Sequence, residues 1–333
     1  MRHSLLSLSL KTLPLAAAAF AFATAAANAA PLRPQDVPAG ANWLAHFDAE
    51  AANAAPAGAK IWDAAAAPHA RFIAKVEAET GFNFRKHVTG VTAYGTGGRG
   101  QGALVVRHRF DNKLVAAWLL THGFAADAAG RFTGVRELPH NGGKLLVRLP
   151  AAGVAIIAVS TADLDAAAQR AAGGDAAGGT ADSAGTAAAL LGALKTPAPV
   201  FVAAGDIAAA KTAAGFDGKF AGVGHRRAHL KKLPVDAKNA AVAVGAGTTA
   251  VTLETLATVA DDAQAASLRD LAASWLKLNA ANVPALKLAV DAEAEGARVT
   301  LKITADAAGV IAEGAKAAAR KFGHCKAATA VQQ

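Results

Sequence analysis

Hydrophobic positions fall into two kinds of stretch from residue 41 onward. Short apolar runs of strand length alternate with longer, alanine-rich segments in which apolar residues recur every three or four positions, as on one face of a helix. In the first half this pattern predicts strands 42–48, 89–95, 102–110, 130–138, 143–149 and 153–160, and helices 60–80, 111–123 and 161–172. In the second half it predicts strands 199–205, 227–233, 239–246, 248–259, 286–294 and 297–304, and helices 186–195, 206–214, 261–281 and 305–321.

The order of these elements predicts the fold class. Strands that follow one another directly outnumber strand–helix–strand alternations, which favours an α+β fold built on largely antiparallel sheets with helices packed on one face of each. Both halves open with a strand that ends in aspartate and runs into alanine-rich chain, Trp43 to Asp48 and Phe201 to Asp206. An aspartate there accepts hydrogen bonds from the free amides of a helix's first turn. We therefore expect two similar α+β units.

The predicted domain boundaries follow from changes in composition. The units span residues 36–172 and 186–322, and the stretch 173–185, which is rich in glycine and small polar residues, is expected to be a flexible connector. Residues 323–333 are expected to form a disordered tail.

Three short motifs resemble a family of exported bacterial proteins of unknown activity. They are the segment from Asp36 to Asp48 (DVPAGANWLAHFD), the strand from Val91 to Gly95, and the strand-to-helix step from Arg107 to Asp111. In that family a "VPA…W…H.D" opening begins a repeated α+β module. The resemblance implies an architecture and brings no catalytic residues with it.

The N-terminus has the pattern of a cleavable export signal. Two cations, Arg2 and Lys11, precede an apolar run from residue 13 to 27, and small residues stand before the expected cut after Ala29. The apolar run is short for a membrane span. We expect residues 1–29 to be a signal peptide and the mature protein to be periplasmic or secreted, with no transmembrane segment.

Composition narrows the function classes. Aromatic residues make up only 5% of the chain although 53% is hydrophobic, so alanine must fill much of the core. Removal of residues 1–29 leaves 32 basic and 25 acidic residues, a net charge of +7 that is spread too thinly for a dedicated nucleic-acid binder. The single cysteine, Cys325, excludes an internal disulfide. Haem-attachment and calcium-loop patterns are absent, and we expect no cofactor and no metal.

The densest basic run lies at residues 224–232. Its cations and histidines are His225, Arg226, Arg227, His229, Lys231 and Lys232. If the run is extended, alternate members share one face and form a ladder that fits an anionic polymer. The alternative is a solvated edge strand whose charges deter pairing with other chains.

The best acid–base candidates are His46, Asp48 and His108. Alternation places His108 on the apolar side of its strand, where burial lowers the affinity of an imidazole for a proton. His46 and Asp48 share one side of the opening strand, and pairing of the two strands would bring all three together. The alternative is two structural histidines and a helix cap.

Other chemical motifs have simpler interpretations. The glycine-rich stretch 95–102 is followed by another predicted strand, which favours a hairpin turn over a phosphate loop, although Arg99 at its tip could meet an anion. No Gly-x-Ser-x-Gly turn occurs. The sequence therefore favours a non-enzymatic binding or structural protein of the cell envelope, whose partner is an anionic envelope polymer or another protein. Two alternatives stay open: a periplasmic hydrolase or isomerase, and a carrier of an apolar ligand.

Overall fold

The structure is a computed structural model that describes residues 32–56, 58–59, 70–95, 101–137, 143–173, 186–196, 199–207, 237–246, 249–280 and 283–313. Its helices are η1 (Pro34–Asp36), α2 (Ala49–Ala54), α4 (Ala70–Thr80), α5 (Phe84–His87), α6 (Asn112–Thr121), α7 (Thr161–Ala171), α8 (Thr186–Gly192), α10 (Asp262–Ala280) and η7 (Pro284–Leu286). The chain is again helical from residue 307 to 313.

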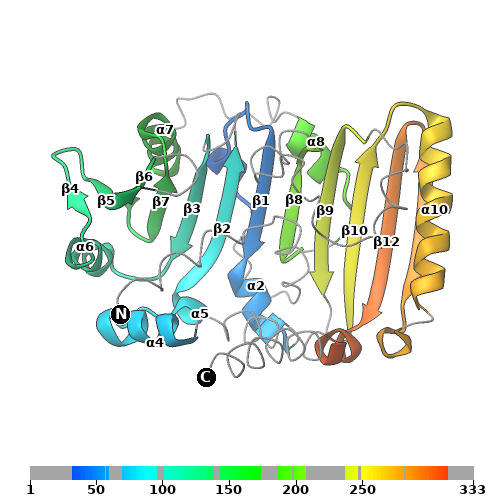
Figure 1. The fold of residues 1–333 in the computed structure, drawn as a ribbon, viewed down its shortest axis with the longest axis horizontal. Coiled ribbons are helices and arrows are strands. Elements are labelled where there is room, and N and C mark those ends of the chain that lie inside the picture. The colour runs from blue at the N-terminus through cyan, green and yellow to red at the C-terminus, as the bar shows by residue number, and fades with distance from the viewer. Residues whose placement is uncertain are drawn as a thin grey trace, which may run out of the picture.

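The strands form one large antiparallel sheet (Figure 1). They are β1 (Trp43–Asp48), β2 (Val88–Gly95), β3 (Ala103–His108), β4 (Ala125–Ala126), β5 (Arg131–Glu137), β6 (Lys144–Ala151), β7 (Val154–Ala158), β8 (Phe201–Asp206), β9 (Asn239–Ala246), β10 (Ala250–Thr258), β11 (Ala289–Glu295) and β12 (Arg298–Asp306). Within the described chain, this 12-stranded sheet has the order β11-β12-β10-β9-β8-β1-β2-β3-β7-β6-β5-β4. The predicted α+β class and the antiparallel pairing are confirmed.

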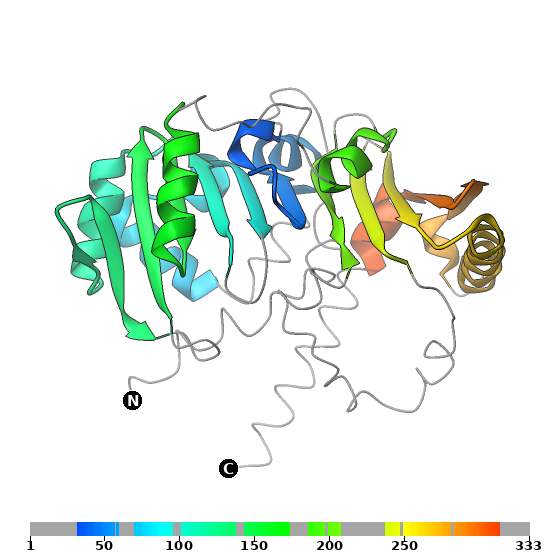
Figure 2. The same cartoon turned by 90° about the horizontal axis from the view of Figure 1, so that it is seen from above.

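The two halves of the chain share this sheet. Strand β1 pairs antiparallel with β8, and Leu44 lies opposite Ala204 while Phe47 lies opposite Phe201. Figure 2 shows the first half in blue to green beside the second half in green to orange. The expectation of a separate sheet in each unit thus differs from the structure, in which backbone hydrogen bonds continue from one half into the other.

The strand order is similar on the two sides of the β1–β8 pair. Outward from this pair, the second half runs β8-β9-β10-β12-β11, and the first half runs β1-β2-β3-β7-β6 and then continues with β5 and β4. In each half a helix, α6 or α10, follows the third strand of the half along the chain. The last strand is followed by α7 in the first half and by the helix that begins at residue 307 in the second.

Helices cover both faces of the sheet, which corrects the expectation of helices on one face. The α7 face carries the side chains of Leu44, Tyr94 and Ile156, which pack in one buried cluster with residues of α7 and α8. The opposite face, here the α6 face, carries Phe132 and Val147, which pack against α6. Helix α10 also lies on the α6 face, where Ala265 contacts Val299. A sequence pattern gives the spacing of apolar residues but not the side of the sheet to which each helix crosses.

Short polar caps fix where the helices begin. Asp48 accepts a hydrogen bond from the amide of Ala51 at 2.8 Å, so the predicted capping role of this aspartate is confirmed. Asp111 caps α6 and Ser160 caps α7 in the same way. The extent of helix α2 was not predicted, because its six residues are too few to show a helical period.

The buried cluster on the α7 face consists largely of small side chains around a few larger ones. Ile156 and Leu164 are fully buried, and alanines of β3, β7, β8, β9, α7 and α8 fill the space around them. Each alanine removes little apolar surface from water, so the core depends on close contact among many residues. The predicted alanine-rich core is confirmed for this cluster.

Candidate functional site

His46 and Asp48 lie side by side on the α7 face of β1 and are both buried. The Nδ1 atom of His46 lies 2.9 Å from the hydroxyl of Thr92, the residue directly opposite on β2. The carboxylate of Asp48 accepts the amide hydrogen of Ala51 and so holds the start of α2. Both side chains therefore have structural partners.

His108 lies on the opposite face of the sheet. On β2, Gly90 lies opposite Asp48 of β1 on one side and opposite Arg107 of β3 on the other, so Asp48 and Arg107 share the α7 face. Because successive side chains of a strand alternate between faces, His108 lies on the α6 face. Strand β2 also separates β1 from β3. The predicted constellation of His46, Asp48 and His108 is therefore not assembled. The expectation failed because β1 and β3 are not neighbours, and because alternation places the two histidines on different faces.

The environment of His108 is apolar, as its pattern predicted. The side chain is 6% exposed, its Nδ1 accepts the amide hydrogen of Phe110 at 3.3 Å, and its Nε2 is buried with no hydrogen-bond partner among the described residues. Burial lowers the pKa of His108, and the neighbouring His87 lowers it further. This imidazole is neutral at pH 7.

A second buried carboxylate, Glu254, lies in the same transverse row as His46. Register pairs connect His46 to Val202, Val202 to Ala243, and Ala243 to Glu254 across successive strands. Three strand spacings, about 14 Å, separate the histidine from the carboxylate, so they do not interact directly. Glu254 accepts the amide hydrogen of Lys195 at 2.9 Å and the hydroxyl hydrogen of Thr196 at 2.5 Å, which anchors the chain after α8.

The N-terminal turn is anchored by a buried ion pair that the sequence analysis missed. Asp36 of η1 is 1% exposed and accepts three hydrogen bonds from Arg107, one at 2.6 Å to Oδ1 and two at 2.8 and 3.0 Å to Oδ2. Such a bidentate pair fixes both position and orientation. Alternation had placed Arg107 beside Val105 on one side of β3, and nothing in the local pattern showed that η1 would cover that side.

Tyr94 and Arg170 form another buried contact on the α7 face. The guanidinium of Arg170 donates to the phenol oxygen of Tyr94 at 2.6 Å and lies 5.5 Å from the ring centroid. Burial raises the pKa of Tyr94 while the charge of Arg170 acts in the opposite direction, so the phenol stays protonated at pH 7. The contact joins α7 to the centre of the sheet.

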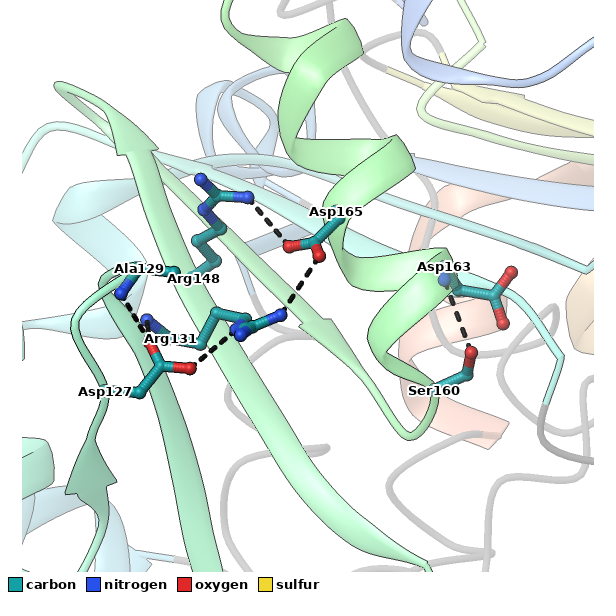
Figure 3. A network of polar contacts seen from close by, with 7 residues as sticks. All are labelled: Asp127, Ala129, Arg131, Arg148, Ser160, Asp163 and Asp165. Carbon is teal, nitrogen blue, oxygen red and sulfur yellow. Dashed lines mark hydrogen bonds and ion pairs between the residues drawn. The ribbon is translucent and has the colours of Figure 1, made fainter.

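A network of ion pairs and hydrogen bonds lies at the β5 end of the sheet (Figure 3). Asp165 of α7 points at two arginines, accepting from Arg131 at 3.2 Å and from Arg148 at 2.8 Å. These arginines lie directly opposite each other on β5 and β6. Asp127 accepts from the amide and the guanidinium of Arg131, and these hydrogen bonds lower the pKa of Asp127. Two carboxylates thus neutralise two guanidinium groups, and the network holds α7 over the sheet.

The predicted anion-binding residues cannot be placed. His225, Arg226, Arg227, His229, Lys231 and Lys232 lie outside the described residues, as do Arg99 and Cys325. Most of the connector, the tail and residues 1–29 also lie outside them. Within the described part of the chain, no group of three or more His, Cys, Asp or Glu side chains could hold a metal ion. No helix there is long and apolar enough to span a bilayer.

Comparisons with known proteins found distant structural similarity and no related sequence. No protein-family model matches the chain, and no curated protein matches it. Solved structures of TP0453 are similar to it. Crystal form I has a TM-score of 0.45 and 10% identity and covers 87% of this chain and 99% of TP0453. Crystal form IV has a TM-score of 0.43 and 12% identity and covers 86% of this chain and 96% of TP0453. Crystal form III has a TM-score of 0.41 and 11% identity and covers 85% of this chain and 98% of TP0453. Scores this low carry no functional argument.

Proposed function

We propose that this protein is an exported, non-catalytic binding or structural component of the cell envelope. The observation that supports this most is the placement of His46 and His108 on opposite faces of one sheet, which removes the best acid–base group that the sequence offered. Export is supported by the sequence pattern of residues 1–29.

We further propose that the protein consists of two tandem copies of one α+β module, joined edge to edge. The matching strand orders on the two sides of the β1–β8 pair support this, as do the aspartates that end β1 and β8. In this proposal the pairing of β1 with β8 gives each module a neighbour for the edge of its first strand. Such pairing removes an exposed sheet edge, which is a risk for aggregation.

The described residues do not favour the two alternatives. A hydrolase or isomerase needs acid and base groups within reach of one substrate atom. The buried groups near the sheet centre instead have structural partners: His46 contacts Thr92, Asp48 caps α2, and Glu254 binds Thr196. A carrier needs space between helices and sheet, whereas the large side chains beneath α7 are fully buried in contact with it.

The partner that we propose is an anionic polymer of the envelope, bound through the basic run at residues 224–232. Six residues in that run are cationic or can become so, and the mature chain has a net charge of +7. A cluster of this kind attracts a polyanion by releasing its counterions, with strong dependence on salt.

Retention on a heparin column tests this partner directly. Replacing Arg226, Arg227 and Lys231 together with alanine should weaken retention on the order of tenfold or more at about 0.1 M salt, because three charges of the basic run are lost. The matched control replaces Lys75, Lys113 and Lys144, which are exposed and dispersed, and so removes the same net charge.

The two triple variants separate local from general electrostatics. The proposal predicts a large loss for the first variant and a small one for the control. Equal losses would show that only net charge matters, and unchanged retention of the first variant would end the polyanion proposal.

A further inference from the structure

Five rings pack together where the α4–α5 segment meets the sheet. Phe82 and His87 come from this segment, and His108 and Phe110 lie at and just beyond the end of β3. Phe82 contacts Phe110 edge-on, with ring centroids 5.1 Å apart, and Phe84 in the same way at 4.8 Å. His87 lies 5.2 Å from Phe110. We call these five residues the ring cluster.

Both histidines of the ring cluster accept a backbone amide hydrogen at Nδ1. The Nδ1 of His87 accepts the amide hydrogen of Asn83 at 2.9 Å, and the Nδ1 of His108 accepts that of Phe110. An imidazole nitrogen that accepts an N–H must keep its lone pair, so the neutral ring of His108 carries its proton on Nε2. A second proton, on Nδ1, would replace an accepted hydrogen bond with two facing N–H groups.

Carboxylates around the ring cluster have other partners, and Asp111, which follows Phe110 in the chain, caps α6 by accepting the amide hydrogen of Lys113. Glu77 accepts from Asn83, and Glu50 pairs with Arg109. The remaining charged or titratable groups of α5 are Arg85, Lys86 and His87, none of which is a carboxylate. The ring of Phe82 meets that of His108 edge-on, with centroids 6.3 Å apart, and brings no negative charge to it.

We propose that the ring cluster is an acid-sensitive latch, which holds the α4–α5 segment on the sheet while His108 is neutral and releases it when His108 takes up a proton. Other contacts also hold the segment, and where α5 passes into β2 the carbonyl of His87 accepts the amide hydrogen of Arg109 at 2.8 Å. Glu79 of α4 meets Trp118 and His122 of α6 at 3.3 and 3.2 Å in a partly exposed position. Asn53 of α2 bonds the carbonyl of Arg85. Release would expose the rings of Phe82, Phe84 and Phe110.

The direction of the pH dependence follows from the burial of His108. Its pKa is lowered in the folded state, so the latch is fully stable above the ordinary histidine pKa of about 6.5 and weakens as the pH falls below that value. Weakening stops once the pH passes below the lowered pKa of the closed state. Since one proton is taken up on opening, the opening equilibrium shifts by up to about tenfold per pH unit within that window.

Hydrogen exchange measured by mass spectrometry on the full chain tests the latch. Between pH 7.5 and 5, protection of the α4 amides should fall by up to about tenfold per unit, after correction for intrinsic exchange, while the amides of β9 and β10 keep theirs. His108→Asn keeps an acceptor for the Phe110 amide but cannot titrate, so α4 in this variant should lose the pH dependence. The matched control is His46→Asn, since His46 is also 6% exposed but lies on the other face; this variant should behave like the wild type.

Two results would overturn the latch. One is protection of α4 that stays constant with pH in the wild type. The other is a loss of protection in His108→Asn equal to that of the wild type. If His108→Asn does not fold, an NMR titration of the His108 ring in the wild type decides: the latch predicts a midpoint below that of an ordinary histidine, linked to a shift of the Phe82 ring, and a midpoint at or above the ordinary value contradicts it.

Discussion

Gly205→Ala should lower the free energy of unfolding by about 1–3 kcal/mol, the usual cost of adding a methyl group where no space exists. Gly205 of β8 lies directly opposite Trp43 of β1, at the junction of the two halves. A Cβ on Gly205 would lie 2.5 Å from the Cβ of Trp43 and 2.6 Å from both the carbonyl oxygen of Asn42 and the Cα of Trp43. Carbon atoms in contact are normally about 3.5–4.0 Å apart, and two of these three neighbours are backbone atoms, so the strands themselves must shift.

The second neighbour of Trp43 is also a glycine. On β2, Gly95 lies opposite Trp43, and a Cβ there would overlap the indole ring. Because both neighbours of Trp43 lack a side chain, the indole ring can lie over the sheet without a clash. The control for Gly205→Ala is Gly40→Ala, since a Cβ added at Gly40 would meet nothing within 4 Å. Urea denaturation should show a change within about 0.5 kcal/mol for Gly40→Ala. Equal stabilities of the two variants would show that Trp43 does not lie against β8.

Arg107→Met should lower the free energy of unfolding by about 3–5 kcal/mol, because it leaves the carboxylate of Asp36 buried without a counter-charge. Asp36 is 1% exposed, and Arg107 donates to both of its oxygens. Replacing Asp36 with leucine in the same chain should recover much of this loss, since an apolar pair no longer holds an uncompensated charge.

An exposed ion pair provides the comparison for Arg107. Lys75 and Glu79 of α4 lie 3.5 Å apart with side chains 65% and 36% exposed, and Lys75→Met should change stability by less than about 1 kcal/mol. The wild type, Arg107→Met, the double variant Arg107→Met with Asp36→Leu, and Lys75→Met can be compared by urea denaturation at pH 7. If Arg107→Met costs no more than Lys75→Met, or if the double variant is as unstable as the single one, the ion pair does not anchor η1 as described.

Local pattern was enough to predict most of the described elements. Alternation of apolar and polar residues located β1, β3, β9 and β10 to within two residues at either end, and the three- to four-residue period located α6, α7 and α10 equally well. These signals arise within each element, from the face that it buries, so they do not depend on the partner. Asp48 was identified as a helix cap for the same reason.

Relations between distant segments were not predictable from the pattern. The pairing of β1 with β8 joins residues more than 150 positions apart, and no local feature of Phe47 or Phe201 predicts that the two lie opposite each other. The face of the sheet on which each helix packs is also decided by tertiary contacts, which the local pattern does not show. The helices were therefore wrongly expected on one face. His46 and His108 were expected together because each lies in an apolar strand, but their meeting depended on strand order.

The same limit explains the polar contacts that were missed. Arg131 and Arg148 come together through the register of β5 with β6, and Asp165 meets them only because α7 crosses above. Tyr94 and Arg170 meet for a similar reason. A charged residue in a predicted strand is first assigned to the solvent, and only the packing of a helix reveals that it is paired.

A disulfide across the β1–β8 pair tests most directly whether one sheet runs through both halves. Backbone bonds join Asp48 to Val200 and Asp206 to Asn42, which makes Ala45 and Ala203 a non-hydrogen-bonded pair with a Cα separation of about 4.5 Å, within the range for a disulfide. With Cys325→Ser to remove the native thiol, Ala45→Cys and Ala203→Cys should form the bond nearly completely under mild oxidation, as measured by a gel shift and mass spectrometry. The control pairs Ala45→Cys with Ala204→Cys, whose side chain points to the opposite face, and should stay reduced. One sheet through both halves predicts this difference, and failure of the first pair to link, or equal linking of both, would contradict it.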